Sequence, residues 1–122
     1  MGNHVLVIED EPNIVEAIQF ILMRDGWDVS TLSDGGLAED TIRSRRPDVV
    51  ILDVMLPGRS GLEILAALRA DAATVSLPVL MLTAKGQGRD RAEAERMGAS
   101  RFMSKPFSNT EILASVRALA GV

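Results

Sequence analysis

The chain has 122 residues, a formal net charge of −4, and hydrophobic and charged fractions of 47% and 25%, which suit one globular domain. The negative charge argues against non-specific binding to nucleic acid or anionic membranes, and no apolar run approaches the roughly 18 residues of a membrane span. Cysteine is absent and His4 is the only histidine, so disulfides, thiolate chemistry and a His-based zinc site or catalytic triad are disfavoured. We expect one cytoplasmic domain, residues 1–122, whose chemistry uses carboxylates, hydroxyls and lysines.

The first half of the sequence alternates short apolar runs with amphipathic stretches. The first run is almost continuously apolar and is typical of a strand buried on both faces. Pro12 suits the first turn of a helix, and Gly26 is expected to end that helix. The predicted elements, in order, are a strand at 5–8, a helix from Pro12 to Gly26, a strand at 27–31, a turn at 33–36, a helix at 37–44 and a strand at 48–52.

The second half continues the same alternation. A loop at 57–61 precedes a helix with leucines at helical spacing, and Ser108 with Glu111 forms a capping box before the last helix. The predicted elements are a helix with Leu62, Leu65 and Leu68 on one face, a strand at 79–82, a helix at 88–97, a strand at 101–103 and a helix after Ser108. Five strands separated by helices predict an α/β fold of the (βα)5 type, with one parallel sheet, helices on both faces and right-handed crossovers.

Polar side chains follow the apolar runs at the positions where the strands are expected to end. Glu9-Asp10-Glu11 follows the first run, Asp53 the third, Thr83 the fourth and Lys105 the fifth. Ligands of open parallel sheets bind beyond the carboxyl ends of the strands. We therefore expect several carboxylates, a hydroxyl and an ammonium to converge on one rim of the sheet.

This set of groups is suited to one type of chemistry. Clustered carboxylates repel one another, and one of them is forced to protonate unless a cation is present. Mg²⁺ is a natural partner, because it binds a few carboxylates together with water and phosphate. A carboxylate beside Mg²⁺, with a lysine and a threonine opposite, can attack phosphorus while the cations offset charge on the transferred oxygens.

Four segments in order carry a resemblance to a known family. They are Val5-Leu6-Val7-Ile8-Glu9-Asp10-Glu11, Leu52-Asp53-Val54-Met55-Leu56-Pro57-Gly58, Leu82-Thr83-Ala84-Lys85-Gly86 and Lys105-Pro106-Phe107. Over essentially its whole length the chain resembles the receiver domain of two-component response regulators, and most of all the receivers of winged-helix transcription factors. The resemblance implies a flavodoxin-like doubly wound sheet with the strand order 2-1-3-4-5.

The resemblance also implies roles for the acidic residues. Asp53 would be the phosphoacceptor, and it would bind Mg²⁺ together with Asp10. Glu9 would reach the ion through a water molecule, and the backbone carbonyl of Met55 would complete the protein ligands. Glu11 has a plainer explanation, since a carboxylate in a first helical turn is favoured by the helix dipole.

A second group of residues would respond to phosphorylation. Lys105 would pair with the phosphoryl oxygens, and its bond to Pro106 would be cis, the form that is accessible mainly before proline. Thr83 would move toward the phosphoryl group, and Phe102 would follow as the switch aromatic, although core packing explains Phe102 equally well. The face formed by the fourth helix, fifth strand and fifth helix would then change its affinity for a target or output domain, after phosphorylation by a histidine kinase or phosphotransfer protein.

The sequence departs from its relatives on that face. Winged-helix receivers usually carry Gly-Ala-Asp-Asp before the switch aromatic, whereas this chain has Gly98-Ala99-Ser100-Arg101. Arg96 and Arg117 fall where those receivers often pair an acid with a base, and like charges oppose association. We therefore expect a monomer or weak dimer. We further expect the bulk of Met55 and Lys85 beside the site to favour a long-lived phosphoryl group.

The same residues argue against three alternative functions. A phosphatase with an aspartyl intermediate usually has a second acid two residues after the nucleophile, where this chain has Met55. A flavodoxin-like nucleotide module needs a phosphate-cradling loop after the first strand, where Glu9-Asp10-Glu11 would repel phosphate. A degenerate receiver is disfavoured because no site residue is missing. The sequence leaves open whether an output domain follows residue 122, and we expect no direct contact of this domain with nucleic acid or membrane.

Overall fold

The computed structural model describes residues 3–83 and 88–122, with the side chains of residues 88–90 excepted. The strands are β1 His4–Ile8, β2 Asp28–Leu32, β3 Val49–Asp53, β4 Val79–Thr83 and β5 Arg101–Ser104. They form one sheet of five strands in the order β2-β1-β3-β4-β5, and every neighbouring pair is parallel. This confirms the predicted flavodoxin-like arrangement.

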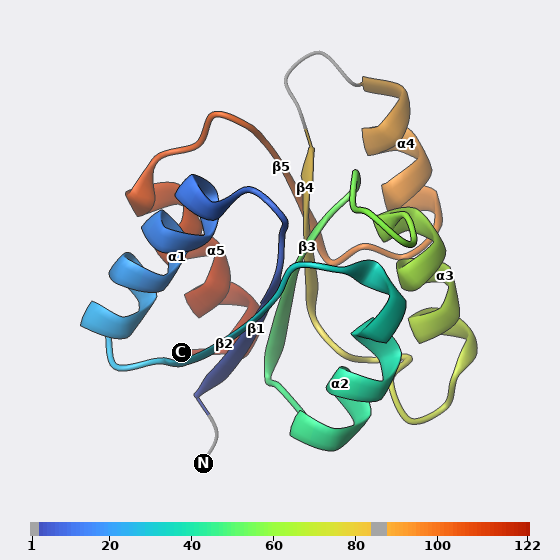
Figure 1. Ribbon diagram of the computed structural model, residues 1–122, viewed down its shortest axis with the longest axis horizontal. Coiled ribbons are helices and arrows are strands. Elements are labelled where there is room, and N and C mark those ends of the chain that lie inside the picture. The colour runs from blue at the N-terminus through green and yellow to red at the C-terminus, as the bar shows by residue number, and fades with distance from the viewer. Residues whose placement is uncertain (1–2, 84–87) are drawn as a thin grey trace.

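Helices cover both faces of this sheet. They are α1 Pro12–Arg24, α2 Ala38–Arg45, α3 Gly61–Ala70, α4 Gly88–Arg96 and α5 Asn109–Ala120, with a short 3-10 helix, η1, at Gly35–Leu37. Figure 1 shows α1 and α5 on one side of the sheet and α2, α3 and α4 on the other. Among the described residues, no helix is long and apolar enough to span a membrane.

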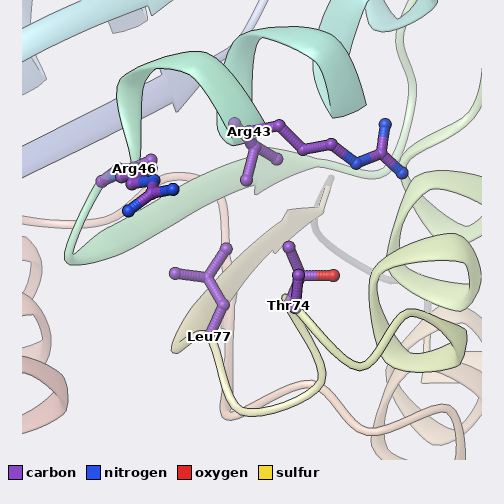
Figure 2. Close-up of a pocket in the computed structure, with 7 residues that line it drawn as sticks. Arg43, Arg46, Thr74 and Leu77 are labelled. Atoms are coloured by element: carbon purple, nitrogen blue, oxygen red, sulfur yellow. The ribbon is translucent and has the colours of Figure 1, made fainter.

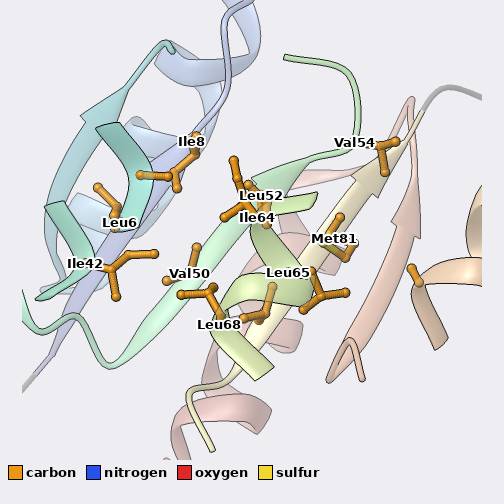
Figure 3. Close-up of a cluster of buried hydrophobic side chains, with 13 residues drawn as sticks. Leu6, Ile8, Ile42, Val50, Leu52, Val54, Ile64, Leu65, Leu68 and Met81 are labelled. Carbon is orange, nitrogen blue, oxygen red and sulfur yellow. The ribbon is translucent and has the colours of Figure 1, made fainter. Parts of the chain in front are cut away.

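Each face of the sheet has its own buried core. Because successive side chains of a strand point to opposite faces, Leu6 and Ile8 of β1 pack with α2 and α3, whereas Val5 and Val7 pack with α1 and α5. Figure 3 shows the first of these cores, in which Leu6 and Ile8 lie on the same face of the sheet as Ile42 of α2 and Ile64 of α3. Burial on both sides explains why β1, β3 and β4 read as continuous apolar runs.

Strands β3 and β4 end on polar residues, as the sequence indicated. Asp53 is the last residue of β3 and Thr83 the last of β4, because the backbone ladder continues past the apolar run. The N–H of Val54 donates to the carbonyl of Leu82 (2.9 Å), and the N–H of Lys105 donates to the carbonyl of Thr83 (2.7 Å). Both polar residues are thereby fixed by strand hydrogen bonds.

The start of α3 is packed tightly behind Asp53. A Cβ added to Gly61 would lie 2.0 Å from the backbone oxygen of Asp53, so only glycine fits there. Ser60 and Glu63 form a capping box at this helix start, and Ser108 and Glu111 form the expected one at α5. These caps satisfy backbone donors that a helix start leaves free.

Candidate functional site

The strand order brings the predicted site residues together at the carboxyl edge of the sheet. β3 lies between β1 and β4, so Asp53 has Glu9 after β1 on one side and Thr83 of β4 on the other. Asp53, Glu9 and Thr83 are 3%, 1% and 1% exposed, whereas Asp10 is exposed. One carboxylate oxygen from each of Glu9, Asp10 and Asp53 lies within 4.8 Å of the other two.

Lys105 reaches this carboxylate cluster from the loop after β5. Its Nζ lies 3.0 Å from Glu9 Oε1, 3.2 Å from Asp53 Oδ2 and 3.2 Å from Glu11 Oε1. Burial lowers the pKa of the Lys105 ammonium, but its contacts with Glu9 and Asp53 outweigh burial, so the pKa is raised. Lys105 is thus a fixed positive charge, and the peptide bond to Pro106 is cis as expected.

Glu9 shows that the carboxylates are not fully compensated by protein groups. Burial, with a contribution from the Asp53 charge, raises the pKa of Glu9 to about 7, although the N–H of Glu11 and the Lys105 ammonium act in the opposite direction. The N–H of Glu11 donates to Glu9 Oε2 at 3.1 Å. Negative charge therefore exceeds what one ammonium neutralises, and a cation would favour the ionised form of Glu9.

Two buried side-chain oxygens in the described part of the chain make no hydrogen bond, namely Glu9 Oε1, which has only the ion pair with Lys105, and Thr83 Oγ1. Buried polar atoms normally have a partner, and exceptions often mark a missing ion, water or ligand. Glu9 belongs to the carboxylate cluster of Asp53, and Thr83 ends the strand next to that of Asp53. An all-oxygen set of this kind fits a hard cation such as Mg²⁺.

The loop after β3 contacts the site through its backbone. The N–H of Met55 donates to Asp53 Oδ1 at 3.3 Å, while the Met55 side chain is 64% exposed. Met55 is therefore placed directly beside the carboxylate cluster, and its role as a carbonyl ligand stays a prediction. Lys85, which was expected to flank the site, lies outside the described residues.

Phe102 lies on β5, where it pairs in register with Met81 of β4, two residues before Thr83. It is half-buried against the core of α2, α3 and α4, and the Arg91 guanidinium lies 5.7 Å from its ring centre. Core packing is thus observed, and the switch role stays a prediction.

The arginines expected to oppose dimerisation have partners within the chain. Arg96 pairs with Glu93 at 2.5 Å. The Nε of Arg117 donates to Asp25 Oδ2 at 2.9 Å, and this bond lowers the pKa of Asp25. Arg117 is therefore bound to the end of α1, a contact across 92 positions of the sequence that no local pattern indicated.

One cavity lies away from this site. It measures about 540 Å³ and is lined by residues that precede β3 and β4, at the opposite edge of the sheet. Figure 2 shows Arg43 and Arg46 from the end of α2 facing Thr74 and Leu77 of the loop before β4. Arg43 is bound by Asp40 and Asp71. The residues that line this cavity include no acid that could accept a phosphoryl group.

Known proteins resemble this chain over nearly its whole length. The family described as "Response regulator receiver domain" matches residues 5–117. "Probable transcriptional regulatory protein TcrX" of Mycobacterium tuberculosis is 44% identical over 115 residues, which are 94% of this chain and 48% of that protein. The chain therefore spans about half the length of this curated relative, which is consistent with the expected resemblance to receivers of transcription factors.

Solved structures agree with this result. The BeF3-activated N-terminal receiver domain of Klebsiella pneumoniae RstA is 30% identical, with a TM-score of 0.88 over 97% of this chain and 98% of that one. The chemotaxis response regulator CheY4 of Vibrio cholerae is 28% identical, with a TM-score of 0.89 over 98% of this chain and 99% of that one.

Proposed function

Because the chain belongs to the response regulator receiver domain family, whose members serve phosphorylation-dependent signalling, we propose that it is a signalling switch with Asp53 as its phosphoacceptor. The observation that carries this proposal is the position of Asp53. It is buried at the end of β3, between the acids Glu9 and Asp10 and the ammonium of Lys105. No other carboxylate in the described residues combines these neighbours.

The proposed reaction transfers a phosphoryl group from a kinase histidine. A carboxylate oxygen of Asp53 attacks phosphorus, the new O–P bond forms as the P–N bond breaks, and the histidine nitrogen keeps the electron pair. Lys105 offsets charge on the phosphoryl oxygens, and Thr83 Oγ1, which has no partner, donates a hydrogen bond to one of them. Bound Mg²⁺, held by Asp10, Asp53 and the carbonyl of Met55, with Glu9 reaching it through a water molecule, would supply the remaining charge neutralisation.

Phosphorylation would then change the surface formed by α4, β5 and α5. The phosphoryl group adds a charge of about −1.5 to −2 at neutral pH, and a hydrogen bond from Thr83 to it draws the end of β4 inward. Phe102 lies on the neighbouring strand, so it is the side chain placed to respond. This movement would alter the affinity of that surface for a target or output domain.

The proposed partners are a sensor histidine kinase or phosphotransfer protein and a downstream target. Receiver domains interact with such kinases and with output domains, and a transcriptional regulatory relative makes a DNA-binding output domain the natural candidate. We propose that residues 1–122 act as one receiver domain and do not themselves contact nucleic acid or membrane. The cytoplasmic location expected from the sequence stays a prediction.

We propose that the domain is a monomer or weak dimer. Arg101 is exposed where related receivers have an acid, and Arg117 is already bound to Asp25. Light scattering of phosphorylated protein should therefore give a mass close to that of the monomer. A phosphorylation-dependent dimer that Arg96→Glu abolishes would contradict this proposal.

Acetyl phosphate provides the test of the phosphoacceptor. After incubation with acetyl phosphate and Mg²⁺, intact mass should show one phosphoryl adduct on the wild type and none on Asp53→Asn. Asp40→Asn is the matched control, because Asp40 is an exposed acid of α2, and it should keep the adduct. Absence of the adduct on the wild type, or its persistence on Asp53→Asn, would overturn the proposal.

A further inference from the structure

The loop between β3 and α3, which carries Met55, is bound on its outer side by a segment far away in the sequence. The N–H of Gly35 donates to the carbonyl of Pro57 at 3.1 Å. An ion pair joins the guanidinium of Arg59 to the carboxylate of Glu39. We call these two contacts the loop clamp. They connect the turn after β2 and the first turn of α2 to the loop that leaves Asp53.

The two segments approach so closely at the clamp that each side needs a glycine. A Cβ on Gly35 would lie 2.5 Å from the backbone oxygen of Arg59, and a Cβ on Gly58 would lie 2.5 Å from Asp34 Oδ1. Gly58 also has a φ of 82°, which side-chain-bearing residues rarely adopt. Asp34 is fixed in turn, because its Oδ1 accepts the N–H of Gly36 at 2.6 Å. The two segments are therefore closely packed at this contact, with no room for a larger residue at either glycine.

The ion pair of the clamp is less exposed than the other ion pairs of α2. The side chains of Arg59 and Glu39 are 32% and 23% exposed, whereas those of Arg43 and Asp40 are 52% and 85% exposed. Partial burial weakens solvent screening, and an arginine on a loop loses side-chain freedom when it is held. Glu39 therefore holds Arg59, and with it the loop, in one position.

The inner side of the same loop faces the carboxylate cluster. The N–H of Met55 donates to Asp53 Oδ1, and the N–H of Gly61 donates to the carbonyl of Val54 at 2.8 Å. The loop is thus fixed at both of its ends, and the clamp fixes the part between them. A binding group that is already in position loses less entropy when a ligand binds.

We propose that Glu39 and Arg59 are positioning residues that hold the Met55 segment in place and so increase the affinity of the acidic site for Mg²⁺. Neither side chain contacts the site; both act through the loop backbone. The inference rests on the proposed function of the carboxylate cluster. It adds α2 to the elements that determine the affinity of that cluster for Mg²⁺.

The test compares Glu39→Gln, Arg59→Gln, their double variant and the charge swap Glu39→Arg/Arg59→Glu. Calorimetric titration with Mg²⁺ alone should show dissociation constants raised by about threefold to tenfold in each single variant, below the ~10–100-fold typical of partners that touch a metal ligand directly. The double variant should be no weaker than either single one, because both remove the same contact. The charge swap should recover part of the affinity.

Two further readouts separate positioning from general stability. In Mg²⁺-free protein, the Gly35 amide should exchange its hydrogen faster in the single variants, because its bond to Pro57 is loosened. In phosphorylation by acetyl phosphate, the Mg²⁺ concentration for half-maximal rate should rise, while the rate at saturating Mg²⁺ stays close to wild type. Arg43→Gln, which breaks the exposed ion pairs of α2 with Asp40 and Asp71, is the matched control and should leave the Mg²⁺ affinity unchanged.

Unchanged Mg²⁺ affinity in Glu39→Gln and Arg59→Gln, or effects of the single variants that add in the double variant, would overturn the inference. So would an equal loss of affinity in Arg43→Gln. A wild type that binds Mg²⁺ but takes no phosphoryl group on Asp53 would instead contradict the proposed function. The inference about Glu39 and Arg59 would then still stand or fall by the Mg²⁺ affinities of the variants.

Discussion

The two edges of the sheet differ in how far their buried polar groups are hydrogen-bonded. At the edge where the strands begin, Arg69 donates from Nε to the carbonyl of Gly98 and from Nη1 to the carbonyl of Leu77, both at 2.8 Å. At the edge where the strands end, Thr83 Oγ1 is buried without a hydrogen bond, and Glu9 Oε1 is buried with only the ion pair to Lys105. Both edges contain half-buried or buried charge, but at the edge where the strands end the carboxylates outnumber the one ammonium that pairs with them.

This difference distinguishes polar groups that stabilise the fold from polar groups that are suited to bind a ligand. The hydrogen bonds of Arg69 connect the end of α3 to the turn between α4 and β5. All of the acceptors in these bonds belong to the protein itself. The carboxylates beside Asp53 outnumber the Lys105 ammonium, and burial raises the pKa of Glu9 to about 7. Such unfavourable burial costs stability, and function is the usual reason that a fold tolerates it.

The largest expected effect is that of Lys105→Met, which keeps the length of the side chain and removes its charge. Lys105 is the only cation that contacts Asp53 among the described residues. We expect the rate of phosphorylation by acetyl phosphate to fall about 10²-fold, as when one charge-stabilising donor is removed from an active site. Stopped-flow or mass-based kinetics measure this rate, with Lys105→Arg as the charge-retaining control. A wild-type rate in Lys105→Met would remove the distinction between the edges.

An intermediate effect is expected from Glu9→Gln in Mg²⁺-free buffer. The pKa of Glu9 is raised from 4.5 to about 7 in the folded protein, so between these values the folded state binds a proton that the unfolded chain has lost. This group therefore makes the wild type more stable as pH falls from above 7 toward 4.5. Glu9→Gln should be more stable than wild type at pH 8.

Thermal melts in a chelator at pH 8 and pH 5 measure this effect. The advantage of Glu9→Gln over the wild type should shrink toward pH 5, where Glu9 is protonated in the wild type. Saturating Mg²⁺ should also reduce it, since a bound cation stabilises the ionised carboxylate. Equal melting temperatures of the two proteins at pH 8 would show that the cluster is not electrostatically strained.

The smallest effect on phosphorylation is expected from Arg69→Gln at the opposite edge. Removal of a half-buried guanidinium leaves the carbonyls of Gly98 and Leu77 without their donor, which should lower the free energy of unfolding by about 1–3 kcal/mol. The rate of phosphorylation should stay within about twofold of wild type. Urea unfolding and the acetyl phosphate assay measure the two quantities. A loss of rate as large as that of Lys105→Met would mean that both edges serve the site.

Most of the fold and the site could be predicted because their signals are local in the sequence. Strands buried on both faces give continuous apolar runs, and the first polar residue after each run lies at the carboxyl edge. Asp53 and Thr83 could be placed at one rim from that rule alone, and Lys105 follows the last run directly after Ser104.

The contacts that the sequence did not indicate join single residues of distant segments. Glu39 with Arg59 and Asp25 with Arg117 belong to no periodic pattern, and each residue alone reads as a solvated charge. Glu11 was assigned only to a helix turn, yet its carboxylate also contacts Lys105. Such pairs follow from the packing of helices on the sheet, which residue spacing along the chain does not encode.

The most direct test of the central claim is to locate the phosphoryl group on the chain. Protein treated with acetyl phosphate and Mg²⁺ is reduced with borohydride, which converts an aspartyl phosphate to homoserine, and peptide mass spectrometry then finds the converted residue. Conversion at Asp53 alone, lost when Mg²⁺ is withheld, is the result that we predict. Conversion at Asp10 or another acid in place of Asp53 would contradict the account.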